Sequence, residues 1–209
     1  QLLGLGPSSV HYATTTSVRL ENRGNVPQGT ARFEFGLVHH GFAWAFPLAN
    51  ELNVGVGTFI RRKGPDSSVI LEELLPSLGF KPNAGVRKSA ALRVWNGHHA
   101  LHGDGIIAIG DAASLCDPFL AEGLRPALMS GCEAAESLIR WFNEDSKNLE
   151  SYSEKMRERW GNSMAWGRRI AQVFYRFPKV GYQLGIKRPT APQRIAQILS
   201  GEMGYGDIA

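Results

Sequence analysis

The sequence predicts a mixed α/β (α+β) protein in which an antiparallel sheet precedes a β-turn-α segment and a helical region. Residues 10–60 are rich in Val, Thr, Phe and Gly and alternate with a short period. Residues 106–142 join a short apolar run to a long helical pattern. The chain after residue 149 reads as helices broken near Gly161 to Gly167, at Pro178, at Gly181 to Gly185 and at Pro189. We therefore divide the chain into residues 1–95, mainly sheet with one helix, residues 96–143, and residues 144–209.

The composition of the 209 residues excludes several classes of protein. A content of 43% hydrophobic and 20% charged residues is that of a globular protein, which excludes disorder as the main character. Two cysteines cannot form a disulfide scaffold or a zinc site unaided, so we expect a reduced, cytoplasmic setting. A net charge of +4 is too small to predict a nucleic-acid partner. Neither a membrane span nor a signal peptide is recognisable, which predicts a soluble or peripheral protein.

The first part of the chain reads as an antiparallel meander with a helix and a further strand. We expect strands at residues 10–20, 31–38, 42–48, 52–60 and 89–95, and a helix at 67–78 that is entered through Pro65-Asp66. Side chains alternate across a strand, so one face of the third strand carries Phe42, Trp44 and Phe46, and the other carries Ala43 and Ala45.

The middle of the chain reads as a strand, a loop and a long helix. Residues 106–110 are all apolar or Gly, as in a strand buried on both faces. Proline is tolerated in the first turn of a helix, so Pro126 places the helix start near Glu122 or Gly123. Apolar side chains recur every three or four residues and predict the face of the helix that contacts the core: Leu124, Leu128, Cys132, Ala135, Ile139 and Phe142.

This strand, loop and helix start could carry chemistry. Asp111 ends the strand, where its carboxylate can accept hydrogen bonds from ligand hydroxyls, and Gly110 and Ala112 let a ligand approach the backbone. The unpaired N–H groups of a helix start at residues 121–125 favour an anionic or electron-rich ligand atom. The segment thus predicts a polyhydroxylated ligand with an anionic end. The alternative is a packing unit in which the Asp only caps backbone N–H groups.

Residues 106–137 resemble the second flavin-binding motif of the FAD-dependent monooxygenase and reductase superfamily, the flavoproteins similar to p-hydroxybenzoate hydroxylase. The resemblance implies FAD as cofactor, with Asp111 on a ribityl hydroxyl and Gly110 in the tight turn. It further implies that the flavin is bordered by Ala112, Pro118, Ala121, Glu122, Gly123 and Leu124. The motif usually has glycine where this chain has Ala121, and a Cβ at that position disfavours an oxygen adduct relative to reduction.

A second resemblance involves Phe42-x-Trp44-x-Phe46-Pro47 followed by Gly55-x-Gly57, which is similar to a signature of the geranylgeranyl reductase family. Residues 199–205 also resemble the C-terminal segment of the proteins of that family. The family hydrogenates prenyl double bonds with reduced FAD, which implies an isoprenoid substrate on this aromatic wall, with the glycines making room for the chain or the flavin. Such a wall would bury a prenyl chain at about 25 cal/mol per Å². The alternative is that the three aromatic residues are ordinary core.

The family's order of segments implies that residues 1–209 follow a first Rossmann segment, supplied in cis or by another chain. Gly-x-Gly-x-x-Gly is absent, Gly4-x-Gly6-x-x-Ser9 is the nearest approach, and Gln1 stands in place of Met. We expect hydride transfer from flavin to a prenyl carbon, an electron donor of the NADPH or ferredoxin type, and a proton donor that the sequence does not identify. Two alternatives stay open: a monooxygenase or halogenase of the same superfamily, and a non-catalytic binding module.

The remaining polar residues give weaker patterns. Residues 155–194 contain ten Lys and Arg and one acid, a net charge of +9. This basic, aromatic tail suits an anionic membrane surface or a prenyl diphosphate, and equally a packed aromatic core under solvated charges. Arg61-Arg62-Lys63 reads as a charged turn. We expect no metal at the histidines, and buried, inert thiols at Cys116 and Cys132. The histidine clusters comprise His39, His40, His98, His99 and His102.

Overall fold

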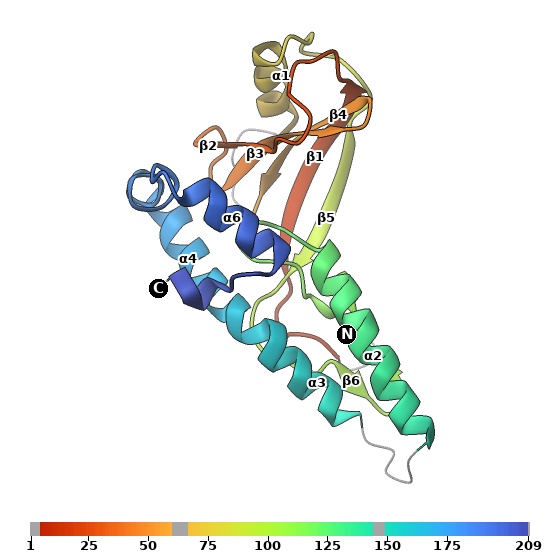
Figure 1. Cartoon of the computed structure of the whole chain (residues 1–209). Coiled ribbons are helices and arrows are strands. Elements are labelled where there is room, and N and C mark those ends of the chain that lie inside the picture. The colour runs from red at the N-terminus through yellow and green to blue at the C-terminus, as the bar shows by residue number, and fades with distance from the viewer. Residues whose placement is uncertain (1–4, 60–66, 144–148, 209) are drawn as a thin grey trace. The chain divides into compact units, whose positions relative to one another are not determined.

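The computed structural model describes residues 5–59, 67–143 and 149–208. They form two compact units (Figure 1), which we call the sheet unit, residues 12–92, and the helical unit, residues 5–11 with 93–208. Gly4, Ile60, the charged turn at residues 61–63 and the helix entry at residues 65–66 lie outside the described residues. Within the described ranges, no helix has the length and apolarity needed to cross a membrane.

Five strands build the sheet in the order β2-β3-β4-β1-β5. Their bounds are β1 (His11–Glu21), β2 (Arg32–Phe35), β3 (Gly41–Leu48), β4 (Glu51–Thr58) and β5 (Lys88–Val94). The predicted meander is right for β2, β3 and β4, which pair antiparallel in sequence order. It is wrong for β1, which pairs antiparallel with β4. The connection at residues 22–31 is no tight hairpin, so it does not force β1 and β2 to be neighbours.

One face of this sheet carries the core of the sheet unit. Helix α1 (Ser67–Ser77) packs there with its buried side chains Ile70, Leu71, Leu74 and Leu75. Ala43 and Ala45 of β3 belong to the same cluster, with Val54 and Val56 of β4. The prediction that β3 has a face of small residues is therefore confirmed, because that face lies under a helix.

The helical unit begins with a short hairpin and a turn. Strands β6 (His102–Gly103) and β7 (Ile106–Ile107) pair antiparallel, and the 3-10 turn η1 (Gly110–Ala113) follows. The prediction of a strand buried on both faces at 106–110 is wrong, because the strand contains two residues, both half-buried, and Ile109 is 44% exposed. An apolar run indicates a preference for burial but does not supply partner strands. Among the described residues, β6 is the only strand paired with β7.

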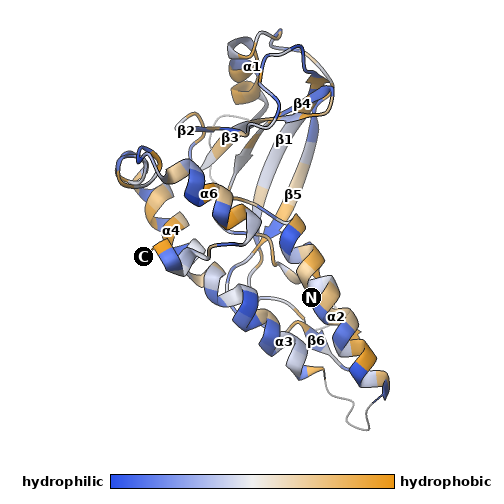
Figure 2. Cartoon of the chain, viewed as in Figure 1, coloured by the Kyte–Doolittle hydropathy of each residue, from blue (hydrophilic) through white to orange (hydrophobic). Residues whose placement is uncertain are grey.

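Helix α2 (Leu124–Asn143) exposes the face that its periodicity assigned to the core. Leu124 is 72% and Phe142 69% exposed, and Leu128, Cys132 and Ile139 are exposed as well. Figure 2 shows the hydrophobic residues recurring along this helix. The opposite face is buried, where Glu133 pairs with Lys155 of the next helix at 3.3 Å. Periodicity identifies an apolar face, but burial of that face requires a covering element, and none is present among the described residues.

The remaining helices are α3 (Glu150–Met156), the π-helical η2 (Arg157–Gly161), α4 (Asn162–Arg176), α5 (Pro178–Gly181), the π-helical η3 (Tyr182–Ile186), α6 (Ala191–Ser200) and the 3-10 turn η4 (Tyr205–Ile208). The break predicted between Gly161 and Gly167 is wrong, because the helix continues through η2 into α4. Gly167 is a packing position instead: a Cβ there would lie 2.7 Å from the Tyr205 ring. The predicted breaks at Pro178 and Pro189 are confirmed, whereas the break predicted at Gly181 to Gly185 is wrong, because α5 continues into η3.

Candidate functional site

The turn after β7 requires its glycine and places the following acid against the start of α2. Gly110 has a φ of +53°, and a Cβ on it would lie 3.2 Å from the Ala127 Cβ. A Cβ on Gly123 would lie 3.2 Å from Asp111 Oδ1, so the carboxylate approaches the helix start. Partial burial raises the pKa of Asp111, although the residue stays open to solvent. The structure thus brings Gly110, Asp111 and Gly123 together.

Three side chains that the sequence analysis did not assign to this site brace the turn. Arg93 donates to the Ala112 carbonyl at 3.0 Å, and Ser130 Oγ of α2 accepts the Gly110 N–H at 3.0 Å. The ring nitrogens of His99 lie 3.0 Å from the Gly97 carbonyl and 2.9 Å from the Ala113 carbonyl. Arg93 and Ser130 carry no motif, and His99 had been considered only as a metal ligand. These contacts hold the backbone on both sides of Asp111.

The loop between the turn and α2 is closed around a buried carboxylate. Asp117 Oδ1 accepts the N–H groups of Phe119 and Leu120 at 2.6 and 2.8 Å, and Oδ2 accepts the Tyr205 hydroxyl at 2.7 Å. The Asp117 N–H donates to the Glu122 carbonyl at 2.8 Å. Burial raises the pKa of Asp117 and that of Tyr205. Pro118 lies buried in this loop, whose shape depends on one side chain.

The end of the loop combines a strained residue with a capped helix start. Ala121 has a φ of +55°, the left-handed region in which a residue with a Cβ costs about 1–2 kcal/mol. Helix α2 begins at Leu124 with Pro126 in its first turn, which confirms the predicted start. Glu122 Oε1 accepts the Arg125 N–H at 2.7 Å. The Ala121 N–H donates to the Asp117 carbonyl at 3.1 Å, so two of the N–H groups expected to face a ligand are used by the chain itself.

The aromatic wall of the sheet unit is larger than the sequence motif indicated. Phe42, Trp44 and Phe46 lie along one face of β3, with the Trp44 and Phe46 rings 6.2 Å apart. Phe33 of β2 joins them, at ring distances of 5.7 Å from Phe42 and 5.1 Å from Phe46, and Phe35 lies 5.7 Å from Phe42. The alternation Phe33-x-Phe35 in an expected strand was the signal that could have extended the wall. Pro47 follows, half-buried.

Gly55 and Gly57 of β4 make room for Trp44 rather than for a ligand. A Cβ on Gly55 would lie 2.2 Å from Trp44 Cζ2, and one on Gly57 would lie 3.3 Å from Trp44 Cζ3. The Trp44 Nε1–H donates to Asn53 Oδ1 at 2.9 Å, which fixes the ring over the glycines. Here the structure differs from the expectation, because the space that the glycines leave is filled by the chain's own indole.

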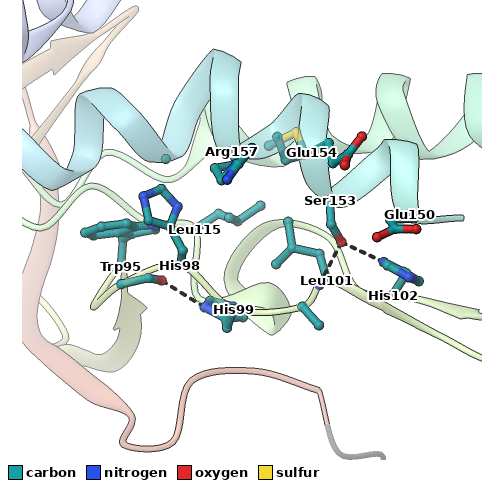
Figure 3. Close-up of a pocket in the computed structure, with 14 residues that line it drawn as sticks. Trp95, His98, His99, Leu101, His102, Leu115, Glu150, Ser153, Glu154 and Arg157 are labelled. Atoms are coloured by element: carbon teal, nitrogen blue, oxygen red, sulfur yellow. Dashed lines mark hydrogen bonds between the residues drawn. The ribbon is translucent and has the colours of Figure 1, made fainter.

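A cavity in the helical unit has a volume of about 380 Å³ (Figure 3). Its lining residues include the histidines that follow β5, His98, His99 and His102. Ser153 Oγ accepts the Leu101 N–H at 3.1 Å and lies 2.7 Å from His102 Nδ1. The His98 ring packs edge-on against Trp95, and burial and the nearby Arg157 lower its pKa. Over the described parts of the chain, no three His, Cys, Asp or Glu side chains are placed to hold a metal ion.

The two cysteines differ in their surroundings. Cys116 is buried in the loop before α2, and burial, reinforced by Asp111, Asp117 and Glu122, raises the pKa of its thiol. A thiol held in its neutral form is a poor nucleophile. Cys132 lies on the exposed face of α2, so the prediction that it is buried is wrong.

Two solved structures have a fold similar to that of this chain. A geranylgeranyl bacteriochlorophyll reductase-like protein from Thermoplasma acidophilum has a TM-score of 0.68 at 18% identity, over 79% of this chain and 44% of that one. A variant of a flavin-dependent brominase has a TM-score of 0.62 at 16% identity, over 90% and 51%. The predicted α/β class, with an antiparallel sheet and helices, is confirmed.

Two proteins that are similar to this chain in sequence are named as reductases. Digeranylgeranylglycerophospholipid reductase 1 of Methanopyrus kandleri is 28% identical over 146 residues, 64% of this chain and 38% of that protein. The menaquinone reductase of Mycobacterium tuberculosis is 30% identical over 154 residues, 69% and 36%. No family model matches the sequence. The chain is similar in sequence to these two proteins named as reductases, and its matched part spans little more than a third of their length.

Proposed function

We propose that this chain forms part of an FAD-dependent reductase that hydrogenates carbon–carbon double bonds of an isoprenoid substrate. The observation that carries the proposal is the segment from Gly110 to Leu124, in which a positive-φ glycine, an open carboxylate and a helix start converge. In this proposal the enzyme is cytoplasmic and takes electrons from NADPH or a ferredoxin-type donor. Relatives named as reductases support the reaction class.

The residues of the segment fit the cofactor. Asp111 offers open carboxylate oxygens to ribityl hydroxyls, and a Cβ at Gly123 would crowd that carboxylate, so the absence of a side chain keeps the approach open. When bound, FAD would supply the hydride. The start of α2 would favour negative charge on the ring, and the loop around Asp117 would hold Pro118, Ala121 and Glu122 in one shape. The aromatic wall would bind the prenyl chain by apolar contact.

The exposed face of α2 supports a further part of this proposal, a covering segment of the Rossmann type in cis or on another chain. Leu128 and Ile139 on this face and Ile109 beside the turn form an exposed apolar surface. Contact of such a surface with water is unfavourable, so it favours burial against another element. Strand β7 leads directly into the same turn, and among the described residues it has one partner strand. A sheet that extends β7 and lies under α2 would bury this surface, and a nucleotide-binding unit is such a sheet.

The proposal is tested by titrating the purified chain with FAD and following the visible absorbance and the quenching of flavin fluorescence. We expect saturable binding, and bound flavin that is bleached by reductant and reoxidised by a prenyl substrate. Asp111→Ala should weaken binding at least about tenfold, since it removes a hydrogen bond from a charged acceptor. Asp104→Ala, an exposed acid in the β6–β7 turn, is the matched control and should bind as the parent does.

Other outcomes would contradict the proposal. A colourless chain that takes up no FAD would leave a non-catalytic binding module. Oxygen consumption with a hydroxylated or halogenated product would favour a monooxygenase or halogenase. Equal FAD binding by Asp111→Ala and Asp104→Ala would remove the role proposed for Asp111.

A further inference from the structure

The last third of the chain has an unusual distribution of charge. Between Glu158 and Glu202 there is no acidic residue, whereas eight Lys and Arg fall in residues 159–201. Four of them are exposed and follow one another from the end of α4, through α5, to the turn after η3: Arg176, Lys179, Lys187 and Arg188. A run of this kind attracts anions, because it gathers several positive charges in one segment that contains no acidic residue.

Apolar side chains are exposed on the same segment. Val173 lies in α4, Phe177 between α4 and α5, Val180 in α5 and Leu184 in η3, so apolar residues recur every three or four positions along this segment. All four are exposed, Phe177 by 58% and Leu184 by 62%, and Tyr182 lies exposed beside them. Apolar residues of an ordinary helix at this spacing face a core. Here nearly every residue from Arg176 to Thr190 is exposed, so the segment projects from the helices behind it.

The apolar character continues inward. A cavity of about 270 Å³ opens next to η3, between α4, α6 and η4. Its lining residues include Leu184, Ile186, Ile195 and Ile198 together with Arg188 and Arg194. A mainly apolar cavity with two arginines among its lining residues suits a molecule that joins an apolar chain to an anionic head.

We propose that residues 173–188 form a docking surface for an anionic phospholipid bilayer. Phe177, Val180, Tyr182 and Leu184 would enter the boundary between headgroups and acyl chains. The four exposed cations would contact lipid phosphates, as in helices that lie in the plane of a membrane. A second copy of this chain is a poor occupant, because two such surfaces carry the same charge. Nucleic acid would leave the exposed aliphatic side chains in water.

The charge arm of the proposal is tested by sedimenting the full chain with vesicles of phosphatidylcholine alone or mixed with phosphatidylglycerol. We expect binding to the mixed vesicles, little binding to phosphatidylcholine, and weaker binding as salt rises. Lys179→Gln combined with Arg188→Gln should weaken binding by about tenfold or more. Equal binding to vesicles with and without phosphatidylglycerol would overturn the proposal. Full binding by the double variant would overturn it as well.

The second test asks whether the exposed apolar side chains enter the bilayer, and it measures the fluorescence of a label attached to this surface. In a Cys132→Ser background, Leu184→Cys carries an environment-sensitive fluorophore, and Val86→Cys on the sheet unit, where Val86 is 80% exposed, is the matched control. We expect a blue shift on anionic vesicles for the label at position 184 and none at position 86. Equal shifts at both positions, or none at either, would contradict insertion.

A charged substitution gives a further check on the same surface. Phe177→Glu, with unchanged circular dichroism and thermal unfolding, should abolish sedimentation with vesicles, whereas Val86→Glu should not. Loss of binding by both variants would indicate a non-specific effect and overturn the assignment. None of these measurements requires FAD, so failure here is distinguishable from failure of the proposed reductase.

Discussion

Single residues in the loop before α2 show what the sequence could and could not reveal. Gly110, Asp111 and the start of the helix were predictable, because each follows from a local rule about turns or helix ends. The role of Asp117 was not, because its hydroxyl partner Tyr205 is 88 positions away in the chain. The positive φ of Ala121 was signalled only by a glycine expected in that place.

We predict that Ala121→Gly stabilises the protein. Glycine adopts the left-handed conformation without the clash of a Cβ, so the free energy of unfolding should rise by about 1 kcal/mol. Chemical denaturation monitored by circular dichroism measures the change. Ala135→Gly, at an exposed helical position of α2, is the control and should destabilise by about 0.5–1 kcal/mol. A loss of stability in Ala121→Gly would contradict the strain assigned to this residue.

We predict that Asp117 makes stability depend on pH. Burial raises the pKa of this carboxyl in the folded state, so its favourable contribution is present below the unfolded value of about 3.9 and is lost as pH rises through the folded value. Asp117→Asn removes the titration, its Oδ1 can accept the Phe119 and Leu120 N–H groups, and its NH2 group can donate to the Tyr205 hydroxyl oxygen. The stability of the parent relative to the variant should therefore fall between acidic and neutral pH. Urea unfolding across this range measures it, and a constant difference would refute the prediction.

At the scale of elements, local patterns located most strands and helices but not their partners. The strand at 42–48 and the helix at 67–78 were found within a residue, because alternation and periodicity are local signals. The pairing of β1 with β4 and the continuity of α3 through η2 into α4 depend on distant packing. Gly161 and Gly167 resemble helix breakers in the sequence because the rings that pack against them, those of His98 and Tyr205, belong to distant parts of the chain.

We predict opposite effects for two glycines in helices. Gly167→Ala places a Cβ 2.7 Å from the Tyr205 ring, so it should destabilise by about 1–3 kcal/mol and loosen η4 from α4. Gly131→Ala in α2 meets no atom within 4 Å and should stabilise by about 0.5–1 kcal/mol. Thermal unfolding, with hydrogen exchange at residues 205–208, measures both. Similar effects of the two substitutions would show that the contact with the Tyr205 ring does not require glycine at position 167.

We predict a graded response in the sheet unit. Gly55→Ala would overlap the Trp44 ring at 2.2 Å, displace the indole from Asn53 and cost about 1–3 kcal/mol. Gly57→Ala, with its Cβ at 3.3 Å, should have a smaller effect. Denaturation midpoints rank the two, and near-ultraviolet circular dichroism follows the indole. An equal or larger loss for Gly57→Ala would contradict the contact assigned to Trp44.

At the scale of the whole molecule, a sequence pattern identifies the apolar face of a helix but does not tell whether another element of the fold covers that face. Helix α1 buries its apolar face, whereas the face of α2 that periodicity assigned to the core is exposed, with Leu124 and Phe142 among its most exposed residues. Both helices carry an apolar face, and only the fold decides whether another element lies against it. The basic tail was recognisable from its composition, whereas the exposure of Phe177 and Leu184 was not.

We predict that the isolated chain self-associates through the stripe of α2. Exposed apolar surface drives association, so size-exclusion chromatography with light scattering should show oligomers whose proportion rises with concentration. Leu128→Lys combined with Ile139→Lys should shift the chain toward monomer, and Val86→Lys should leave it unchanged. A monodisperse parent chain would argue that the stripe is already covered in solution.

The hydrogen bond between Asp117 and Tyr205 has a consequence for biosynthesis. A chain emerging from the ribosome makes Asp117 long before Tyr205, and until then the buried carboxylate lacks one of its three donors. The loop before α2 therefore reaches its final shape only after the last helices have been translated and packed. Shortening the chain before residue 205 would leave a nascent site that resembles the finished one in sequence but not in form.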